Sequence, residues 1–238
     1  MKLAVVGKGQ MGQLIQSTAI ERGDEAILGD AFDQAPIVDH KESLDVIVDF
    51  SHPNSLDFVL DTLKDTSCAL VMGTTGFSQE QVERLKEEAK VRPIFYASNY
   101  SVGIAVLTRL VQEANKMLAN WDKEIIESHH HKKADAPSGT ALSLLKALDP
   151  NDEYDHVFGR YGKPGPRGHE IGIHAVRGGS VPGNHDVLFL GDQEVISLSH
   201  NAQSRQIFVN GALDAAQFIA GKPAGLYDMN DLLKEHLG

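Results

Sequence analysis

The chain has 238 residues, a formal net charge of −11, 42% hydrophobic and 23% charged residues, and a single cysteine. This composition is ordinary for a globular protein, and the acidic balance argues against a nucleic-acid partner because phosphate backbones are also negative. One cysteine, Cys68, excludes an internal disulfide. With no recognisable signal peptide and no apolar run of membrane-spanning length, we expect a cytoplasmic protein with no membrane partner.

Over the first hundred residues, short apolar runs alternate with amphipathic stretches. Helical spacing is expected at residues 11–19 and 78–90, the second with a capping box of Ser78 and Gln81. Buried strands are expected at 3–6, 26–28, 46–50, 69–72 and 94–96. Such strand–helix alternation predicts a parallel sheet with helices on both faces.

The pattern changes after residue 100. Residues 104–118, 140–148 and 206–220 have helical spacing, and residues 124–128 are expected to form a strand. A loop rich in glycine, proline and basic residues follows at 159–170. Strand-like runs separated by short turns come next, at 171–177, 186–190 and 194–199. Consecutive strands of this kind predict an antiparallel or mixed sheet, and therefore a second domain of different build.

A glycine-rich turn follows the first predicted strand. Its six residues have the pattern G-x-G-x-x-G: Gly7, Lys8, Gly9, Gln10, Met11 and Gly12. Glycines at this spacing permit a tight turn and the close approach of a pyrophosphate to the N-terminus of the next helix. The strand before the turn and the helix after it favour dinucleotide binding over an ordinary strand–helix turn.

Other cofactor contacts are expected where later strands end. Asp30 follows the second strand, where a carboxylate would bind the adenosine ribose and favour NADH, although a solvated loop carboxylate is the alternative. Lys8 would instead suit the 2′-phosphate of NADPH, so either cofactor is possible. The loops after two further strands supply Gly73, Thr74 and Thr75, and Ala97, Ser98, Asn99 and Tyr100.

Residues 127–141 form the most unusual stretch, ESHHHKKADAPSGTA. Adjacent histidines on one strand point to opposite faces, and we find no second Cys/His cluster, so we expect no metal site. A solvated basic loop is a further alternative. Histidine exchanges protons near neutral pH, and a helix start after Pro137 binds carboxylates well. The stretch therefore favours acid–base chemistry on a small acid.

This stretch closely resembles the signature E-x-H-H-x-x-K-x-D-A-P-S-G-T-A of the dihydrodipicolinate reductase family, whose members reduce 4-hydroxy-tetrahydrodipicolinate in the diaminopimelate pathway of lysine biosynthesis. Every fixed position of the signature is present. The resemblance covers nearly the whole chain, including Asp49-Phe50-Ser51-His52-Pro53, Gly73-Thr74-Thr75-Gly76-Phe77, Asn99-Tyr100-Ser101-Val102-Gly103, Arg177-Gly178-Gly179, Gly183-Asn184-His185 and Tyr227-Asp228-Met229.

The resemblance implies a role for each matched residue. His129 and Lys133 match the residues that transfer protons, and His130, Gly139 and Thr140 match contacts to a dicarboxylate substrate. The glycine-rich turn and the two later loops match contacts to NADH or NADPH.

The resemblance also implies a fold. A Rossmann-like cofactor domain (1–100 and 211–238) would surround an inserted α+β domain with a mixed sheet (101–210) that binds substrate and builds a homotetramer. The chain departs from many members at Gln10, where arginine is common in a longer turn, and at Lys132, where histidine is common.

Two other functions fit parts of the sequence. A different oxidoreductase on the same scaffold, such as an amino-acid or aspartate dehydrogenase, would not need the His/Lys stretch. A nucleotide sensor without catalysis would not need the loop at 135–140. We expect the loop at 159–170, with Arg160, Lys163 and Arg167, either to help close the site or to be simply solvated.

Overall fold

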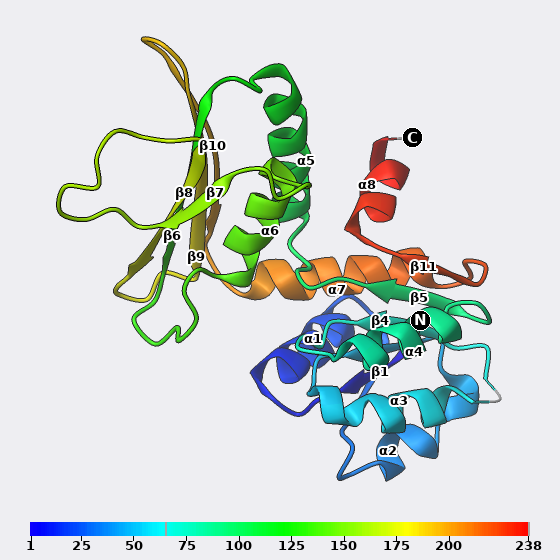
Figure 1. Ribbon diagram of the computed structural model, residues 1–238. Helices are drawn as coiled ribbons and strands as arrows, with labels where there is room; N and C mark the ends of the chain where they lie inside the picture. The colour runs from blue at the N-terminus through cyan, green and yellow to red at the C-terminus, as the bar shows by residue number, and fades with distance from the viewer. Residues whose placement is uncertain (65, 238) are drawn as a thin grey trace. The chain divides into compact units, whose positions relative to one another are not determined.

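Two separate sheets organise the chain, which the computed structural model describes over residues 1–64 and 66–237 (Figure 1). They belong to two units, one of Met1–Val102 with Gln206–Gly238 and the other of Gly103–Arg205. Helix α7 (Gln206–Ile219) begins the returning segment of the first unit. Residues 206–210 therefore lie with the first sheet, whereas the sequence-based ranges assign them to the second domain.

The first unit is built on a six-stranded parallel sheet in the order β11-β5-β4-β3-β1-β2. Its strands are β1 (Lys2–Val6), β2 (Glu25–Gly29), β3 (Val46–Asp49), β4 (Ala69–Met72), β5 (Pro93–Tyr96) and β11 (Gly225–Tyr227). All residues of β3 and β4 are buried, as expected for strands covered on both faces. The predicted Rossmann-like sheet is confirmed.

Helices pack on this sheet within the first unit. They are α1 (Gln10–Glu21), α2 (Ala35–Val38), α3 (Leu56–Leu63), α4 (Gln79–Glu88), α7 and α8 (Met229–Leu237), with short 3-10 turns at Lys41–Ser43 and Pro53–Ser55. Helices α3 and α4 share a core with Ile47 and Leu70, and α7 packs against α1, β3, β4 and β5. The capping box of Ser78 and Gln81 is present at the start of α4.

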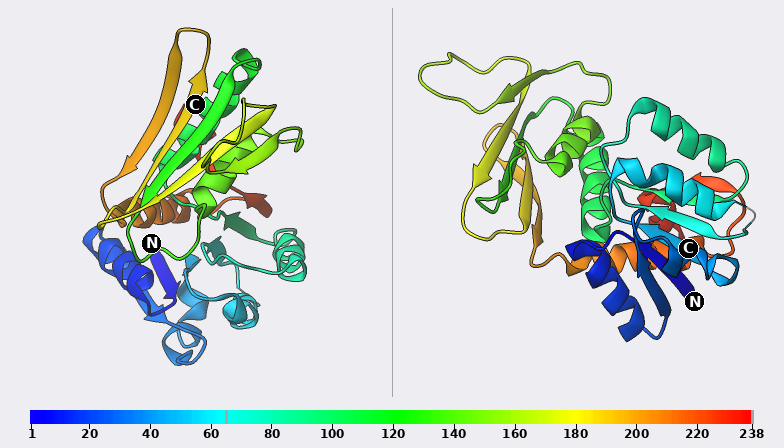
Figure 2. Two further views of the ribbon diagram at one scale, coloured as in Figure 1. Left: turned by 60° about the vertical axis from the view of Figure 1, so that its left-hand side comes forward. Right: turned by 90° about the horizontal axis from the view of Figure 1, so that it is seen from below.

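The second unit is built on a five-stranded mixed sheet in the order β10-β9-β6-β8-β7 (Figure 2). Its elements are α5 (Val102–Met117), β6 (Asp122–His129), α6 (Gly139–Leu148), β7 (Asp155–Phe158), β8 (Glu170–Arg177), β9 (Gly183–Leu190) and β10 (Val195–Ala202). Residues of β6 alternate between buried and more exposed positions, and α5 and α6 share a core with the buried ones. The predicted mixed sheet is confirmed, and β7 is a strand that the sequence analysis missed.

None of the helices in the described part of the chain is both long and apolar enough to span a bilayer.

Asp49, the last residue of β3, is a carboxylate at 0% exposure in the first unit. Ser51 Oγ donates to its Oδ1 at 2.5 Å, while Oδ2 has no hydrogen-bond partner. Burial raises the pKa of Asp49 to about 6, although hydrogen bonds from Ser51 and Thr74 act in the opposite direction. Burial therefore favours the neutral acid, and ionisation at neutral pH costs stability.

We expect Asp49→Asn to remove a pH-dependent part of the stability. The folded-state pKa of about 6 is above the ordinary aspartate value of 3.8, so stability from this group is fully present below the lower value and is lost as the pH rises to the higher one. The unfolding free energy of wild type minus that of the variant should fall by about 2–3 kcal/mol between pH 4 and pH 7. Urea titrations measure it, and a difference independent of pH would contradict the assignment.

Candidate active site

The glycine-rich turn joins β1 to α1 in the first unit. Gly7 has a φ of +114°, and a Cβ there would lie 2.5 Å from the Phe50 carbonyl oxygen. A Cβ on Gly12 would collide with the Gly7 carbonyl, whereas one on Gly9, the residue that precedes α1, would have no atom within 4 Å. Two glycines are thus required for packing, and the third leaves the start of α1 open, as a pyrophosphate requires.

Asp30 and Lys8 are the residues predicted to contact the adenosine ribose and its 2′-phosphate. Asp30 follows β2, and its Oδ1 accepts the backbone N–H groups of Phe32 and Asp33 at 2.8 Å each. These two bonds lower the pKa of Asp30. The Lys8 ammonium forms an ion pair with Asp33, a residue that the sequence analysis did not single out. Asp30 is therefore a structured carboxylate rather than a freely solvated one.

The loops after β4 and β5 meet Met11 around one hollow of about 250 Å³. Its lining consists of Met11, Phe50, Gly73, Ser98, Asn99, Tyr100 and Phe208. Tyr100 contributes its ring only, because its buried hydroxyl donates to the Met72 and Phe95 carbonyls. Thr74 is also buried, and its hydroxyl accepts the Ser51 N–H, whereas Thr75 is exposed. The structure thus brings together at one sheet edge residues from three predicted cofactor segments.

In the second unit, His129 lies at the end of β6 and is held by Glu127 on the same strand. The His129 Nδ1 atom donates to Glu127 Oε2 at 2.5 Å, and the Glu127 side chain is fully buried. The other ring nitrogen, Nε2, faces Gly183, where a Cβ would come within 2.9 Å of it. Glu127 therefore fixes the ring, and Gly183 leaves room beside the nitrogen that is available for proton transfer.

Glu127 also accepts hydrogen bonds from two segments of the second unit that are distant in sequence. Arg177 on β8 donates to both of its carboxylate oxygens at 2.8 Å, and the Ser138 N–H donates to Oε1 at 3.0 Å. Burial raises the pKa of Glu127, but the hydrogen bonds from Arg177, His129 and Ser138 outweigh it and hold the pKa below its usual value. The group is a carboxylate at neutral pH.

A second buried histidine, His185 on β9, packs edge-on against His129 with ring centroids 5.1 Å apart. Burial, and then the charge of His129, lower the pKa of His185 to about 4. Its Nε2 atom is hydrogen-bonded to Ser138 Oγ at 3.0 Å, and the same oxygen accepts the Ala141 N–H and caps α6. The sequence places Ser138 at the helix start that is expected to bind carboxylate, whereas His185 appears there only within the Gly183-Asn184-His185 motif, with no predicted role.

The predicted substrate contacts gather near this cap. Gly139 is exposed, with no atom within 4 Å of a Cβ built on it, and Thr140 follows it in the first turn of α6. Partial burial, and then the charge of Arg205, lower the pKa of His130. Lys133 forms an ion pair with Asp135 at 2.8 Å. A helix start and several basic residues thus surround the position that the sequence predicts for a carboxylate.

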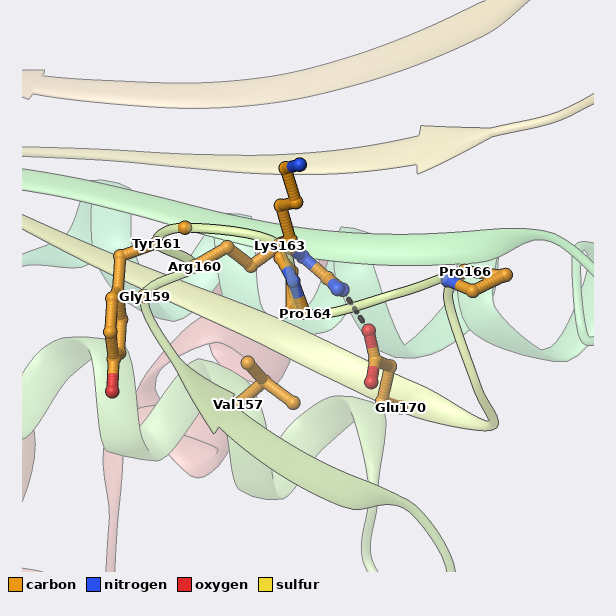
Figure 3. A pocket seen from close by; sticks show the side chains of 9 residues that line it. Val157, Gly159, Arg160, Tyr161, Lys163, Pro164, Pro166 and Glu170 are labelled. Atoms are coloured by element: carbon orange, nitrogen blue, oxygen red, sulfur yellow. Dashed lines mark hydrogen bonds and ion pairs between the residues drawn. The ribbon is translucent and has the colours of Figure 1, made fainter.

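The loop at 159–170 lies over the β7–β8 edge of the second unit (Figure 3). It encloses a hollow of about 420 Å³ whose lining includes Arg160, Tyr161, Lys163 and Glu170. Arg160 pairs with Glu170, and Arg167 pairs with Glu124. These two arginines are therefore engaged with strand carboxylates, and a role of the loop in closing the active site stays a prediction.

We expect Glu127→Gln to destabilise the protein by about 3–5 kcal/mol at pH 7, because Arg177 would keep its charge and lose its carboxylate partner. The pKa of Glu127 is below its usual value, so its contribution is present at neutral pH and is lost as the pH falls below the ordinary glutamate value of 4.5. Urea titrations at pH 7 and pH 4 should show a smaller deficit at pH 4. Asp135→Asn, at a carboxylate 58% exposed, is the control and should cost under about 1 kcal/mol. Equal stability of Glu127→Gln and wild type at pH 7 would contradict the argument.

Comparisons with known proteins identify the family. The model of the dihydrodipicolinate reductase N-terminus matches residues 1–100, and that of the C-terminus matches residues 103–233. The 4-hydroxy-tetrahydrodipicolinate reductase of Caldanaerobacter subterraneus is 42% identical over 239 residues, covering 95% of each chain. The protein of the same name from Alkaliphilus oremlandii is 42% identical over 238 residues, covering 98% of each chain.

Among solved structures, the chain resembles a dipicolinate-bound dihydrodipicolinate reductase from Paenisporosarcina sp. TG-14. The TM-score is 0.77 at 22% sequence identity, and the match covers 97% of this chain and 98% of the other. At this sequence identity the structural likeness supports the fold alone. The two family models and the two relatives show the family. The chain belongs to the dihydrodipicolinate reductase family.

Proposed function

We propose that the protein reduces 4-hydroxy-tetrahydrodipicolinate to tetrahydrodipicolinate with NADH or NADPH, in the diaminopimelate pathway of lysine biosynthesis. The observation that carries the proposal is the buried Glu127–His129 pair beside a capped helix start, in a chain that also has an open glycine-rich turn. The two curated relatives carry the name of this reaction. We further propose that the first unit binds the cofactor and that the second binds the substrate.

The substrate is a cyclic imine with two carboxylates. Loss of its hydroxyl as water leaves a C=C bond conjugated with the C=N bond, and the nicotinamide, when bound, supplies a hydride. Hydride addition at the far end of the conjugated system moves an electron pair toward the imine, and a proton must then reach the adjacent ring carbon. The protein must therefore hold two carboxylates and deliver one proton.

The residues of the second unit suit both tasks. Glu127 accepts the hydrogen bond from Nδ1 of His129 and orients the ring, so that Nε2 is the ring atom left to transfer a proton to the substrate. Lys133 supplies a second N–H donor, and its charge is balanced by Asp135 while no substrate is bound. His130, Gly139 and Thr140 would hold a substrate carboxylate at the start of α6, where the helix dipole favours negative charge.

The fit of a dinucleotide to the first unit rests on steric observations. Gly9 leaves the start of α1 open, and the hollow lined by Met11, Gly73 and Asn99 lies at the carboxyl edge of the parallel sheet. Lys8, Gln10 and Asp30 would contact the adenosine half, and Thr75, Ala97 and Ser98 the nicotinamide half.

We also propose a homotetramer built through the second unit. Helices α5 and α6 cover one face of its sheet, and apolar side chains remain exposed elsewhere on its strands, with Val176 52% and Val195 55% exposed. Exposed apolar side chains on an open sheet are typical of an interface. The cytoplasmic location expected from the sequence stays a prediction, which cell fractionation would test.

We expect His129→Gln to lower kcat by about 10²–10⁴-fold while NADH binding is retained, because only the proton donor is lost. The assay follows NADH oxidation with freshly made substrate. His131→Gln is the matched control: His131 is exposed, its Nδ1 bonds the Gly179 carbonyl, and kcat should change by less than about twofold. Unchanged kcat in His129→Gln would exclude the proton-transfer role.

The same assay separates the alternatives. An amino-acid dehydrogenase would oxidise or form amino acids and leave the dihydrodipicolinate precursor untouched, and a sensor would bind cofactor without turnover. Either result with the wild-type protein would overturn the proposed reaction.

We expect Val176→Glu to reduce the assembly, because a charge would be buried at the proposed interface. Light scattering after size-exclusion chromatography should give four times the chain mass for wild type and a smaller assembly for the variant. Val91→Glu, at a residue 71% exposed in the first unit, should remain tetrameric. A monomeric wild type would contradict the proposal.

A further inference from the structure

The loop that follows β2 brings two carboxylates and one ammonium together at the edge of the glycine-rich turn. Asp30 N–H donates to the Asp33 carbonyl at 3.3 Å, and Asp30 Oδ1 accepts two N–H groups in return, so residues 30–33 form a closed turn. Gly29 has no side chain, and the space is filled by Ile37 and the Asp33 carbonyl. The backbone of Asp33 is therefore held through both its N–H and its carbonyl group.

Lys8, in the glycine-rich turn, contacts this loop through Asp33. The Gln13 side-chain amide donates to the Lys8 carbonyl at 2.9 Å and fixes the backbone, and the Lys8 ammonium pairs with Asp33. The hydrogen bond to Asp33 raises the pKa of Lys8, and the charge of Asp30 acts in the same direction. One positive charge thus faces two negative charges.

The two nicotinamide cofactors differ only in the 2′-phosphate on the adenosine ribose. The charges of Lys8, Asp30 and Asp33 bear on which of them binds. The two backbone bonds to Asp30 use Oδ1, so its Oδ2 can accept a ribose hydroxyl. A 2′-phosphate would bring its negative charge to Asp30 and Asp33, and it would have to compete with Asp33 for Lys8.

We propose that Asp33 is a specificity-determining residue that holds Lys8 away from a 2′-phosphate and makes the protein prefer NADH. This inference rests on the proposed function, because it assumes that the dinucleotide binds at the glycine-rich turn. Lys8 alone would favour NADPH; the Lys8–Asp33 pair, next to Asp30, favours NADH.

The test measures dissociation constants of NADH and NADPH for the protein without substrate, by titration calorimetry. Wild type should bind NADH more tightly than NADPH. Asp33→Asn releases the Lys8 ammonium, so NADPH binding should tighten by about 5- to 20-fold while NADH binding changes by less than about twofold. The gain should shrink at high ionic strength and disappear in the double variant Lys8→Met with Asp33→Asn.

A matched control is available in the same unit. Lys90 and Glu87 form a comparable exposed ion pair at 2.6 Å. Glu87→Gln releases Lys90 as Asp33→Asn releases Lys8, and it should leave the binding of both cofactors unchanged. The Asp33 side chain is 55% exposed, so the variant should fold, which circular dichroism checks.

The outcomes separate this inference from the proposed function. A wild type that prefers NADPH, or an Asp33→Asn variant with an unchanged ratio of the two constants, would overturn the inference and leave the reductase proposal standing. Binding of neither cofactor would overturn both.

Discussion

The second unit depends on how one buried carboxylate is compensated. Glu127 is fully excluded from solvent, and an uncompensated charge there would cost several kcal/mol. It is satisfied by two bonds from Arg177 on β8, one from the His129 ring and one from the N–H of Ser138. These donors come from three separate segments, so a single charge holds the end of β6, the end of β8 and the start of α6 in register. The orientation of His129 follows from that arrangement.

The neighbouring His129 and His185 rings have different hydrogen-bond partners. His129 binds a carboxylate, whereas His185 is buried beside the Ser138 hydroxyl with a pKa of about 4. Desolvation keeps the His185 ring neutral, whereas the Glu127 carboxylate orients the His129 ring through its Nδ1 atom. The His185 ring is hydrogen-bonded to Ser138 Oγ, which caps α6, and the Ser138 N–H donates to Glu127, which holds His129. The helix cap and the proposed proton donor are therefore connected through Ser138 and Glu127.

In the first unit, the shape of the glycine-rich turn depends mainly on steric constraints. A Cβ on Gly7 or Gly12 would strike the backbone, whereas the space over Gly9 is open, so the turn is shaped by the absence of side chains. At the edge of the turn, Lys8 and Asp33 form an ion pair. On the proposal above, affinity for a dinucleotide depends on the glycines and discrimination between NADH and NADPH depends on Asp33, so a change at Asp33 would alter the second property and leave the first.

The sequence by itself determined the parallel and mixed sheets, most helices, the glycine-rich turn and the His/Lys segment, because each depends on local periodicity or on a contiguous motif. It missed the strands β7 and β11 and the helix α2, which are at most four residues long, and the longer helices α3 and α8. Only the tertiary structure decided the partners of Glu127. Arg177 lies 50 residues away and reaches it because β6 and β8 pair in parallel with His129 opposite Arg177. Strand register sets such contacts, and no local pattern encodes it.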